Sequence, residues 1–279
     1  MKKLLAIFNG LKFSESTLQY AVKLGVQHDM AVTGIFIEDF IYTGQGIFRS
    51  YSEEQPTTEG GWELLRKDKL LREITVEKFE TACLHAGVKY LVYRDKLTAV
   101  SDLLKESKYA DLLIIDASET MNLFWEDSPT RFVREILSRA NCPILLVPKK
   151  FIDIKSIYWL YDSSPVSIYA FKMFCYIFPL LSILPFKVLA VQVAEDRKLI
   201  TFSPMVRELI QLHVPHAEFI TLYGQPELEI PLFIRKQEPE LLIILGAYQR
   251  NAFSMFFRTS MADVLTKEEQ WPMFIAHNK

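Results

Sequence analysis

The sequence predicts an α/β protein with two domains, each a doubly wound parallel sheet flanked by helices, and three observations support this prediction. Two acid-led apolar runs, at 111–116 and 240–246, are typical of strands buried on both faces of a sheet. Each of these runs is followed by a second short apolar run that begins at a proline. Pro143 stands 27 positions after the end of the first acid-led run, and Pro272 stands 26 positions after the end of the second. Helical patterns separate the apolar runs, and this alternation implies right-handed crossovers between parallel strands.

Apolar spacing and capping signals place the elements of the first half. Ser14 is the expected N-cap of the first helix, because a serine hydroxyl accepts a hydrogen bond from a first-turn amide. Gly87 is expected to end a long amphipathic helix, since glycine readily takes a positive φ. The polar stretch 38–61 exceeds an ordinary connection and predicts a surface excursion or lid. The elements are strand 4–8, helix 14–24, strand 31–37, helix 64–86, strand 89–93, helix 99–107, strand 112–115, helix 131–138 and strand 144–147.

The second half repeats this order. Its first helix, 166–178, is apolar nearly all round, so that it is either buried on both sides by the other half or exposes a partner-binding patch. We expect burial within the chain. The charged stretch 149–154 predicts a linker between a first domain at 1–148 and a second at 155–279. The elements are strand 157–161, helix 166–178, strand 188–193, helix 204–212, strand 217–223, helix 227–236, strand 241–245, helix 260–267 and strand 273–276.

The composition argues against several classes of protein. With 32 basic and 34 acidic residues in 279, the formal net charge is −2, and no basic excess attracts nucleic acid. Cys83, Cys142 and Cys175 are widely spaced and predict reduced, buried thiols in a cytoplasmic protein. The apolar start of the chain predicts a strand rather than a signal peptide, and the uncharged stretch 173–186 is too short to span a bilayer. We therefore expect a cytoplasmic protein that binds neither nucleic acid nor membrane.

Patterns that carry catalysis or metal binding are sparse. The chain has ten glycines, and they form neither a GxGxxG nor a GxxxxGK[ST] loop. His213 and His216 have a ligand-like spacing, but a structural zinc site needs about four ligands, so a surface turn explains them better. No GxSxG, HExxH or Ser-x-x-Lys arrangement points to a nucleophile or a hydrolytic zinc. We expect no catalytic residue, no metal site and no enzymatic activity.

Three segments resemble the universal stress protein family, in the form that carries two copies in one chain. The turn Asp162-Ser163-Ser164 is similar to the family's opening Asp-x-Ser turn, and residues 110–115 and 142–148 are similar to its fourth and fifth strands. The resemblance covers essentially the whole chain. It implies two Rossmann-like domains of the adenine nucleotide alpha hydrolase type, each with a five-stranded parallel sheet. It also implies pairing through the fifth strands into an intramolecular pseudo-dimer, with a homodimer as a further option.

Many members of this family bind ATP or AMP through an aspartate after the first strand and a Gly-x2-Gly-x9-Gly-Ser/Thr loop after the fourth. In the second half, Gln249 and Thr259 stand where glycines would let the backbone approach a phosphate. Arg250 could supply charge in their place, although it is equally explained as a solvated residue. The resemblance implies a weakened adenine-nucleotide site formed by Asp162, Ser163, Val193, Gly246, Gln249, Arg250, Thr259 and Ser260.

The corresponding positions of the first half are degenerate and are not expected to bind ATP. Carboxylates at Asp116 and Glu119 repel a polyphosphate, and Pro129 lacks an amide donor. Lys12 aligns most simply with the family's aspartate, although a short slip would put Asn9 there instead. We expect Asp116 to cap the following turn. The degenerate equivalents are Lys12, Asp116, Glu119, Pro129 and Thr130.

Together these observations predict a non-enzymatic stress-response protein with a binding or regulatory role. One alternative is a purely structural or protein-interaction module, in which Tyr248, Phe253 and Phe256 fill the crevice of the second half. A less favoured alternative is a nucleotide hydrolase of the same fold group. That activity would need a catalytic base beside the phosphates, and the sequence shows none.

Overall fold

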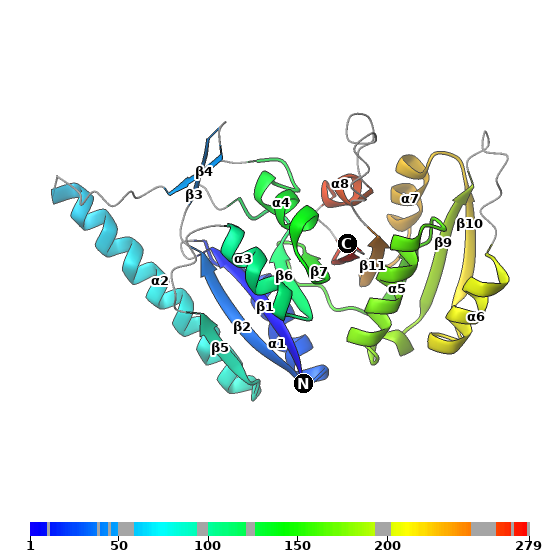
Figure 1. Ribbon diagram of the computed structural model, residues 1–279, viewed down its shortest axis with the longest axis horizontal. Coiled ribbons are helices and arrows are strands. Elements are labelled where there is room, and N and C mark those ends of the chain that lie inside the picture. Colours follow the sequence, from blue (N-terminus) through cyan, green and yellow to red (C-terminus); the bar gives the residue numbers. More distant parts are fainter. Residues whose placement is uncertain are drawn as a thin grey trace. The chain divides into compact units, whose positions relative to one another are not determined.

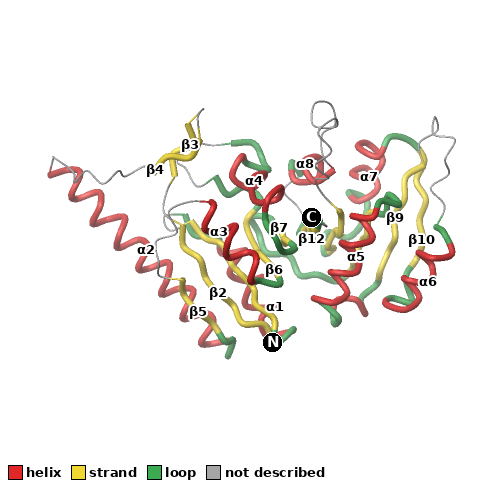
Figure 2. The backbone as a smooth tube through the Cα atoms, viewed as in Figure 1, coloured by secondary structure: helices red, strands yellow, loops and turns green. Residues whose placement is uncertain are grey.

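A computed structural model describes most of the 279-residue chain, which divides into two compact units, Met1–Cys142 and Pro143–Lys279. Both units alternate strands with helices (Figures 1 and 2). This alternation confirms the predicted α/β class, with largely parallel sheets flanked by helices. The described residues are 1–9, 12–37, 40–43, 46–49, 59–93, 100–120, 126–192, 202–246, 261–268 and 271–277.

The first unit contains a parallel sheet in the order β6-β1-β2-β5. Helix α1 packs against β1, β2 and β6, and α2 packs against α1, β2 and β5. The core of the unit is formed by the buried strand side chains between these layers. The elements are β1 (Lys2–Asn9), α1 (Glu15–Gln27), β2 (Met30–Ile37), β3 (Phe40–Thr43), β4 (Gly46–Arg49), α2 (Glu59–Ala86), β5 (Tyr90–Tyr93), α3 (Val100–Glu106), the 3₁₀ turn η1 (Ser107–Tyr109), β6 (Leu112–Asp116) and α4 (Arg131–Arg139).

The predicted helix ends are confirmed by local hydrogen bonds. The Ser14 hydroxyl accepts a hydrogen bond from the Thr17 amide at 3.2 Å, which satisfies a first-turn donor of α1. Gly87 has a φ of +67° after the last turn of α2. There its amide donates to the Leu84 carbonyl at 3.1 Å, and the Val88 amide donates to the Cys83 carbonyl at 3.0 Å.

The predicted excursion at 38–61 contains structure that the sequence pattern did not reveal. Strands β3 and β4 pair antiparallel, with Phe40 opposite Arg49 and Thr43 opposite Gly46. Helix α2 begins at Glu59, inside the same stretch and before the predicted start at residue 64. The segment is therefore a short hairpin followed by the first turn of a helix, at least over its described residues.

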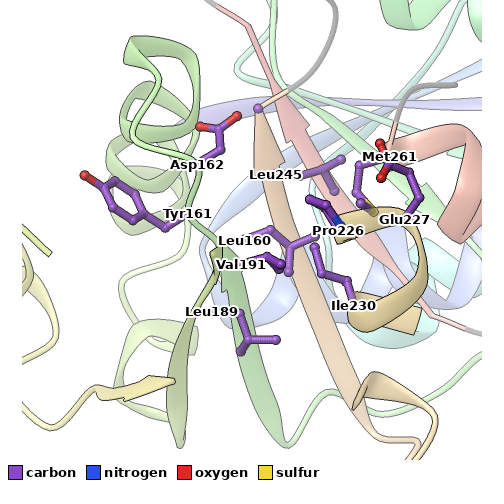
Figure 3. A pocket seen from close by; sticks show the side chains of 11 residues that line it. Leu160, Tyr161, Asp162, Leu189, Val191, Pro226, Glu227, Ile230, Leu245 and Met261 are labelled. Atoms are coloured by element: carbon purple, nitrogen blue, oxygen red, sulfur yellow. The ribbon is translucent and has the colours of Figure 1, made fainter. Parts of the chain in front are cut away.

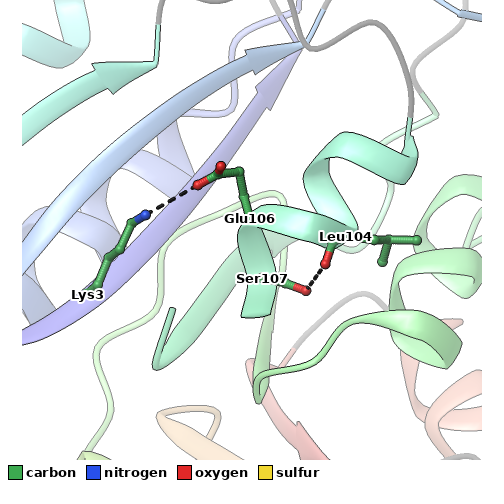
Figure 4. Close-up of polar contacts among 4 residues, drawn as sticks. All are labelled: Lys3, Leu104, Glu106 and Ser107. Atoms are coloured by element: carbon green, nitrogen blue, oxygen red, sulfur yellow. Dashed lines mark hydrogen bonds and ion pairs between the residues drawn. The ribbon is translucent and has the colours of Figure 1, made fainter. Parts of the chain in front are cut away.

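The end of α3 is fixed to the sheet by a small group of polar contacts, shown in Figure 4. The Lys3 ammonium forms an ion pair with Glu106 at 3.3 Å, which joins the start of β1 to the last residue of α3. The Ser107 hydroxyl donates to the Leu104 carbonyl at 2.7 Å and accepts from the Asn141 amide at 3.0 Å. These bonds satisfy polar groups at the helix end and connect it to the residues that follow α4.

The second unit contains a sheet in the order β10-β9-β8-β11-β12-β7. All its described pairs are parallel except β12 with β7, in which Phe274 lies opposite Leu145. The elements are β7 (Ile144–Val147), β8 (Ser156–Leu160), α5 (Pro165–Ile177), η2 (Leu181–Ile183), β9 (Phe186–Gln192), α6 (Pro204–His213), β10 (Glu218–Tyr223), α7 (Pro226–Ile234), β11 (Leu241–Gly246), α8 (Met261–Thr266) and β12 (Met273–Ala276).

The boundary between the compact units differs from the boundary that the repeat predicts. The units divide after Cys142, whereas the repeat places the end of the first domain at residue 148. The difference comes from β7, which is the fifth strand of the first repeat but hydrogen-bonds to β12. Contacts therefore assign this strand to the second unit, although its sequence belongs to the first repeat.

Helix α5 buries one face in its own unit, which corrects the expectation that it is covered on both sides. Phe171 stacks on Trp159 with centroids 4.4 Å apart, and Phe174 meets Phe274 edge-on at 5.4 Å. On the other side, 54% of Tyr176 is exposed. The aromatic face therefore belongs to the core beneath β11 and β12. None of the described helices has the length and apolarity needed to cross a membrane.

All three cysteines are buried and none forms a disulfide, as the sequence predicts. Burial raises the pKa of the Cys83 thiol to about 12 and that of the Cys175 thiol to about 11. A thiol with so high a pKa carries little of the thiolate that reacts with oxidants or metals. Cys83 and Cys175 therefore act as small apolar core residues.

The stability of the first unit is expected to depend on His28, which follows α1. Burial and the nearby Lys2 ammonium lower its pKa from 6.5 to about 4. Between these values His28 is protonated in the unfolded chain and neutral in the folded one. The stability that comes from keeping His28 neutral is therefore complete above pH 6.5 and is lost as the pH falls to about 4. Chemical denaturation from pH 7 to 4 should show that the free energy of unfolding falls more steeply with pH for the native chain than for His28→Gln. Equal pH dependences for the two proteins would contradict this expectation.

Candidate functional site

A pocket of about 240 Å³ lies at the carboxyl ends of β8, β9 and β11 in the second unit (Figure 3). This edge is where parallel sheets commonly bind ligands, because the chain leaves β8 toward β9 on one side and returns to β11 on the other. Residues at the start of α7 and at the start of α8 also line it. The described residues that line it are Leu160, Tyr161, Asp162, Leu189, Val191, Pro226, Glu227, Ile230, Leu245, Gly246 and Met261.

The pocket combines apolar walls with a carboxylate on either side. Leu189 and Val191 come from one face of β9, since alternate residues of a strand point the same way. Ile230 and Leu245 face them from α7 and β11. In Figure 3 the side chain of Tyr161 points away from these residues. The arrangement suits a flat apolar group whose polar atoms reach toward Asp162 and Glu227.

Asp162 shapes the turn between β8 and α5. Its Oδ1 accepts a hydrogen bond from the Ser164 amide at 2.8 Å, a turn that aspartate commonly forms with an amide two residues later. Ser163, within that turn, has a φ of +62°. The Ser164 hydroxyl then caps α5 by accepting from the Ser167 amide at 3.1 Å. Burial and the neighbouring Asp162 charge raise the pKa of Tyr161 above its ordinary value.

Gly246 is required by packing. A β-carbon built at this residue would stand 2.7 Å from the Ser167 nitrogen and 2.7 Å from the Val166 carbonyl carbon. These are backbone atoms of the first turn of α5, which have no flexible side chain to move aside. The single glycine that the sequence keeps from the family's loop thus allows β11 to end against α5.

Polar bonds hold the first turn of α5 against β8. The buried Ser167 hydroxyl donates to the Leu160 carbonyl at 3.0 Å and accepts from the Trp159 indole N–H at 3.1 Å. Both partners lie in the strand that leads into the pocket. The turn that carries Asp162 is therefore fixed at both ends, by a capped helix and by a strand.

Glu227 is a pocket residue that the sequence analysis missed. It stands in the first turn of α7, which begins at Pro226 with Gln225 as its N-cap. The Gly224 amide donates to the Gln192 carbonyl at 3.1 Å, which ties this turn to the end of β9. A proline three positions after the end of the predicted strand 217–223 is a signal that a helix starts at the ligand edge.

In the first unit, the corresponding strand end is occupied by the carboxylate of Asp116. Its Oδ2 accepts from the Ser14 hydroxyl at 3.0 Å, and its Oδ1 accepts from the amide and the hydroxyl of Ser118, both at 2.8 Å. The predicted capping role is therefore confirmed. Where Gly246 lets the backbone of α5 approach β11, Asp116 reaches the N-cap of α1 through its side chain.

The strand registers decide between the two alignments of the family's aspartate. Ala6 lies opposite Ile114 in one unit, and Trp159 lies opposite Ile244 in the other. Continuing both registers to Asp116 and Gly246 makes Asn9, rather than Lys12, the equivalent of Asp162. The Asn9 amide group donates to Glu119 at 3.2 Å, so the two buried side chains bind each other. The exposed Lys12 contributes its backbone amide, which donates to the side-chain oxygen Oδ1 of Asn9 at 3.3 Å.

Thr130 and Pro129 have structural positions at the start of α4. The Thr130 hydroxyl accepts from the Val133 amide at 3.2 Å as the N-cap of that helix. The same hydroxyl donates to the Glu119 carbonyl. Both Pro129 and Thr130 are buried. Over the described residues, these contacts use the polar groups that a phosphate would need in the first unit.

The structure thus brings together two of the eight residues predicted for the second half. Asp162 and Gly246 line one pocket, and Ser163 lies beside Asp162 without lining it. Val191 lines the pocket two residues before the predicted Val193. Several predicted residues lie outside the part of the chain that the structure describes, namely Val193, Gln249, Arg250, Thr259 and Ser260, together with Tyr248, Phe253 and Phe256 of the structural alternative.

Comparison with solved structures finds the same architecture in universal stress proteins. One from Archaeoglobus fulgidus is 11% identical with a TM-score of 0.68, and the match covers 99% of this chain and 96% of that one. A putative universal stress protein from Pseudomonas aeruginosa is 14% identical with a TM-score of 0.54, over 99% of this chain and 93% of that one. A functionally unknown protein from Pseudomonas aeruginosa is 14% identical with a TM-score of 0.55, over 99% and 92%.

No protein-family model and no curated protein sequence matches the chain. The similarity therefore lies in the fold, which extends over nearly the full length of each of these three structures. At 11% to 14% identity, the overall fold is similar while most residues differ. The predicted resemblance is confirmed at this level: the chain has the fold of a universal stress protein.

Proposed function

We propose that this chain is a cytoplasmic, non-enzymatic binding or regulatory protein of the universal stress type, whose second unit binds an adenine-containing ligand. The observation that carries the proposal is the pocket in which Asp162 and Gly246 meet apolar walls from β9, α7 and β11. A stress-response role follows from the resemblance to that family. Three buried cysteines without a disulfide support placement in a reducing compartment.

The size and the lining of the pocket suit a nucleobase. Pockets that bury drug-sized ligands commonly measure about 300–1,000 Å³, and this pocket, at about 240 Å³, is smaller. Leu189, Val191 and Leu245 present branched side chains that can pack on the faces of a flat ring. Asp162 stands at the mouth, where its carboxylate can accept hydrogen bonds from ligand hydroxyl or amino groups.

We propose that the first unit does not bind a nucleotide. Asp116 and Glu119 already accept hydrogen bonds from Ser14, Ser118 and Asn9. A phosphate entering this region would meet two carboxylates and displace bonds within the protein. We expect the free energy lost through repulsion and displaced hydrogen bonds to exceed the free energy gained from an exposed phosphate contact.

We also propose that the two sequence repeats pair through their last strands. The antiparallel register of β7 with β12 supports this, since β7 ends the first repeat and β12 ends the second. A protein-interaction role is the alternative function, and one observation favours it. Tyr176, Leu180 and Ile183 are exposed by 54%, 54% and 72% on α5 and the residues after it.

Calorimetric titration with adenosine, AMP, ADP and ATP tests the ligand proposal. We expect heat from at least one of these ligands, and no heat after Val191→Trp, because the indole would fill the pocket. Thr221→Trp, at an exposed position of the neighbouring strand β10, is the matched control and should bind as the native chain does. Thermal melts of both variants show whether they are folded. Absence of heat from all four ligands would overturn the proposal and favour the interaction role.

A further inference from the structure

The charges at the pocket mouth indicate which form of an adenine ligand it takes. Resting on the function proposed above, we propose that this site selects an uncharged nucleoside and discriminates against its phosphate esters. Asp162 at the end of β8 and Glu227 at the start of α7 are the two residues that set this preference. Both line the pocket, and Figure 3 shows them on opposite sides of its apolar walls.

The two carboxylates repel a phosphate group. Each adds negative charge at the mouth of an apolar pocket, and low-dielectric walls strengthen the repulsion of a further negative group. Both side chains are exposed, so solvent screens each of them. The effect of one carboxylate is therefore modest, and the preference arises from the pair.

The first turns of α5 and α7 are already largely occupied by the protein's own groups. A helix N-terminus binds phosphate through its free amides. At α5, the Ser164 amide donates to Asp162, the Ser167 amide donates to the Ser164 hydroxyl, and Pro165 has no N–H. At α7, Pro226 likewise lacks an N–H, and the Leu228 and Glu229 amides donate to the Gln225 carbonyl. These bonds leave few first-turn amides for a phosphate in either helix.

The same groups favour a ligand that donates hydrogen bonds. Ionised carboxylates are acceptors only, and the hydroxyls of a ribose are donors that match them. Oδ1 of Asp162 is used by the Ser164 amide, which orients the carboxylate at the mouth. Ribose hydroxyls can therefore reach Asp162 and Glu227 while the base packs between Val191 and Leu245.

Calorimetric titration with adenosine, AMP and ATP, in a chelating buffer at low and high salt, tests this selection. We expect the affinity to fall from adenosine to AMP to ATP, and the ATP affinity to rise with salt, because salt screens the repulsion. Glu227→Gln should raise the ratio of ATP to adenosine affinity by about 2–5-fold. Glu229→Gln is the matched control. It removes the same charge from the same helix turn, but Glu229 does not line the pocket, and the ratio should stay unchanged.

The outcomes separate this inference from the function on which it rests. No binding by any ligand overturns the function itself. Binding of ATP more tightly than adenosine, or an ATP affinity that falls with salt, overturns the selection and leaves the function standing. A titration with Mg²⁺ belongs in the series, since carboxylates and phosphates together can hold this ion. A reversal of the order on adding Mg²⁺ would also overturn the selection.

Discussion

Replacing Asp116 by alanine is expected to lower the free energy of unfolding by about 2–4 kcal/mol. The carboxylate accepts three hydrogen bonds, one from Ser14 and two from Ser118, and only 8% of the residue is exposed. Its removal leaves donors at the N-cap of α1 and in the following turn without their acceptor. Urea denaturation followed by circular dichroism measures the change.

A smaller change within the same group of contacts is the control. Ser118→Ala removes one of the three bonds and leaves the carboxylate in place with the other two. It should therefore cost clearly less than Asp116→Ala. Equal costs for the two variants, or a tolerated Asp116→Ala, would show that the capping network does not hold the end of β6 against α1.

Replacing Gly246 by alanine is expected to cost about 1–3 kcal/mol, as overpacking of a closely packed site commonly does. The new β-carbon would lie 2.7 Å from backbone atoms of both Val166 and Ser167. Relief requires α5 to move away from β11, and this motion would disturb the Ser167 hydrogen bonds that fix the helix to β8. Thermal and urea denaturation of the variant measure the loss.

Gly87→Asn is the matched control for this substitution. Gly87 differs from Gly246 in having a positive φ of +67°, and a β-carbon there would meet nothing within 4 Å. Asparagine tolerates that backbone region, so this variant should cost much less. A Gly246→Ala variant as stable as Gly87→Asn would mean that the glycine is kept for another reason, such as access to a ligand.

Most of the fold could be predicted because its elements have strong local signals. The strand predicted at 144–147 and the one at 273–276 match β7 and β12 residue for residue. The N-caps Ser14 and Ser164 mark the starts of α1 and α5. The hairpin of β3 and β4 was missed because its strands are four residues each and lie in a polar stretch. Short strands stabilised mainly by their pairing leave little pattern in the sequence.

Features that depend on contacts between distant residues were harder to predict. The assignment of β7 to the second unit follows from its pairing with β12, which the family resemblance implies but no local pattern encodes. Glu227 is a solvated helix residue by its pattern and becomes a pocket residue only because α7 starts beside the carboxyl ends of β8 and β11. The position of Gly246 in the sequence suggests a role in phosphate binding, whereas the structure shows the backbone of α5 on the side where a β-carbon would stand.

The role of Asn9 in the candidate site also depends on contacts between distant residues. Alignment from the serine caps favours Lys12 as the counterpart of Asp162, because the sequence separation between Lys12 and Ser14 equals that between Asp162 and Ser164. The strand registers favour Asn9, since β1 continues to that residue before the turn begins. The two alignments differ because three more residues separate Asn9 from Ser14 than separate Asp162 from Ser164. The strand pairing shows that these extra residues follow Asn9.

A methyl-detected NMR titration with adenosine is the sharpest test of ligand binding in the second unit, because the pocket is lined by residues that carry methyl groups. We expect saturable chemical-shift changes for Leu189, Val191, Ile230 and Leu245. Ile7 and Ile115, in the strands that end at Asn9 and Asp116, should not shift. Unchanged pocket methyl signals at millimolar adenosine, or shifts confined to the first unit, would show that the pocket of the second unit does not bind adenosine.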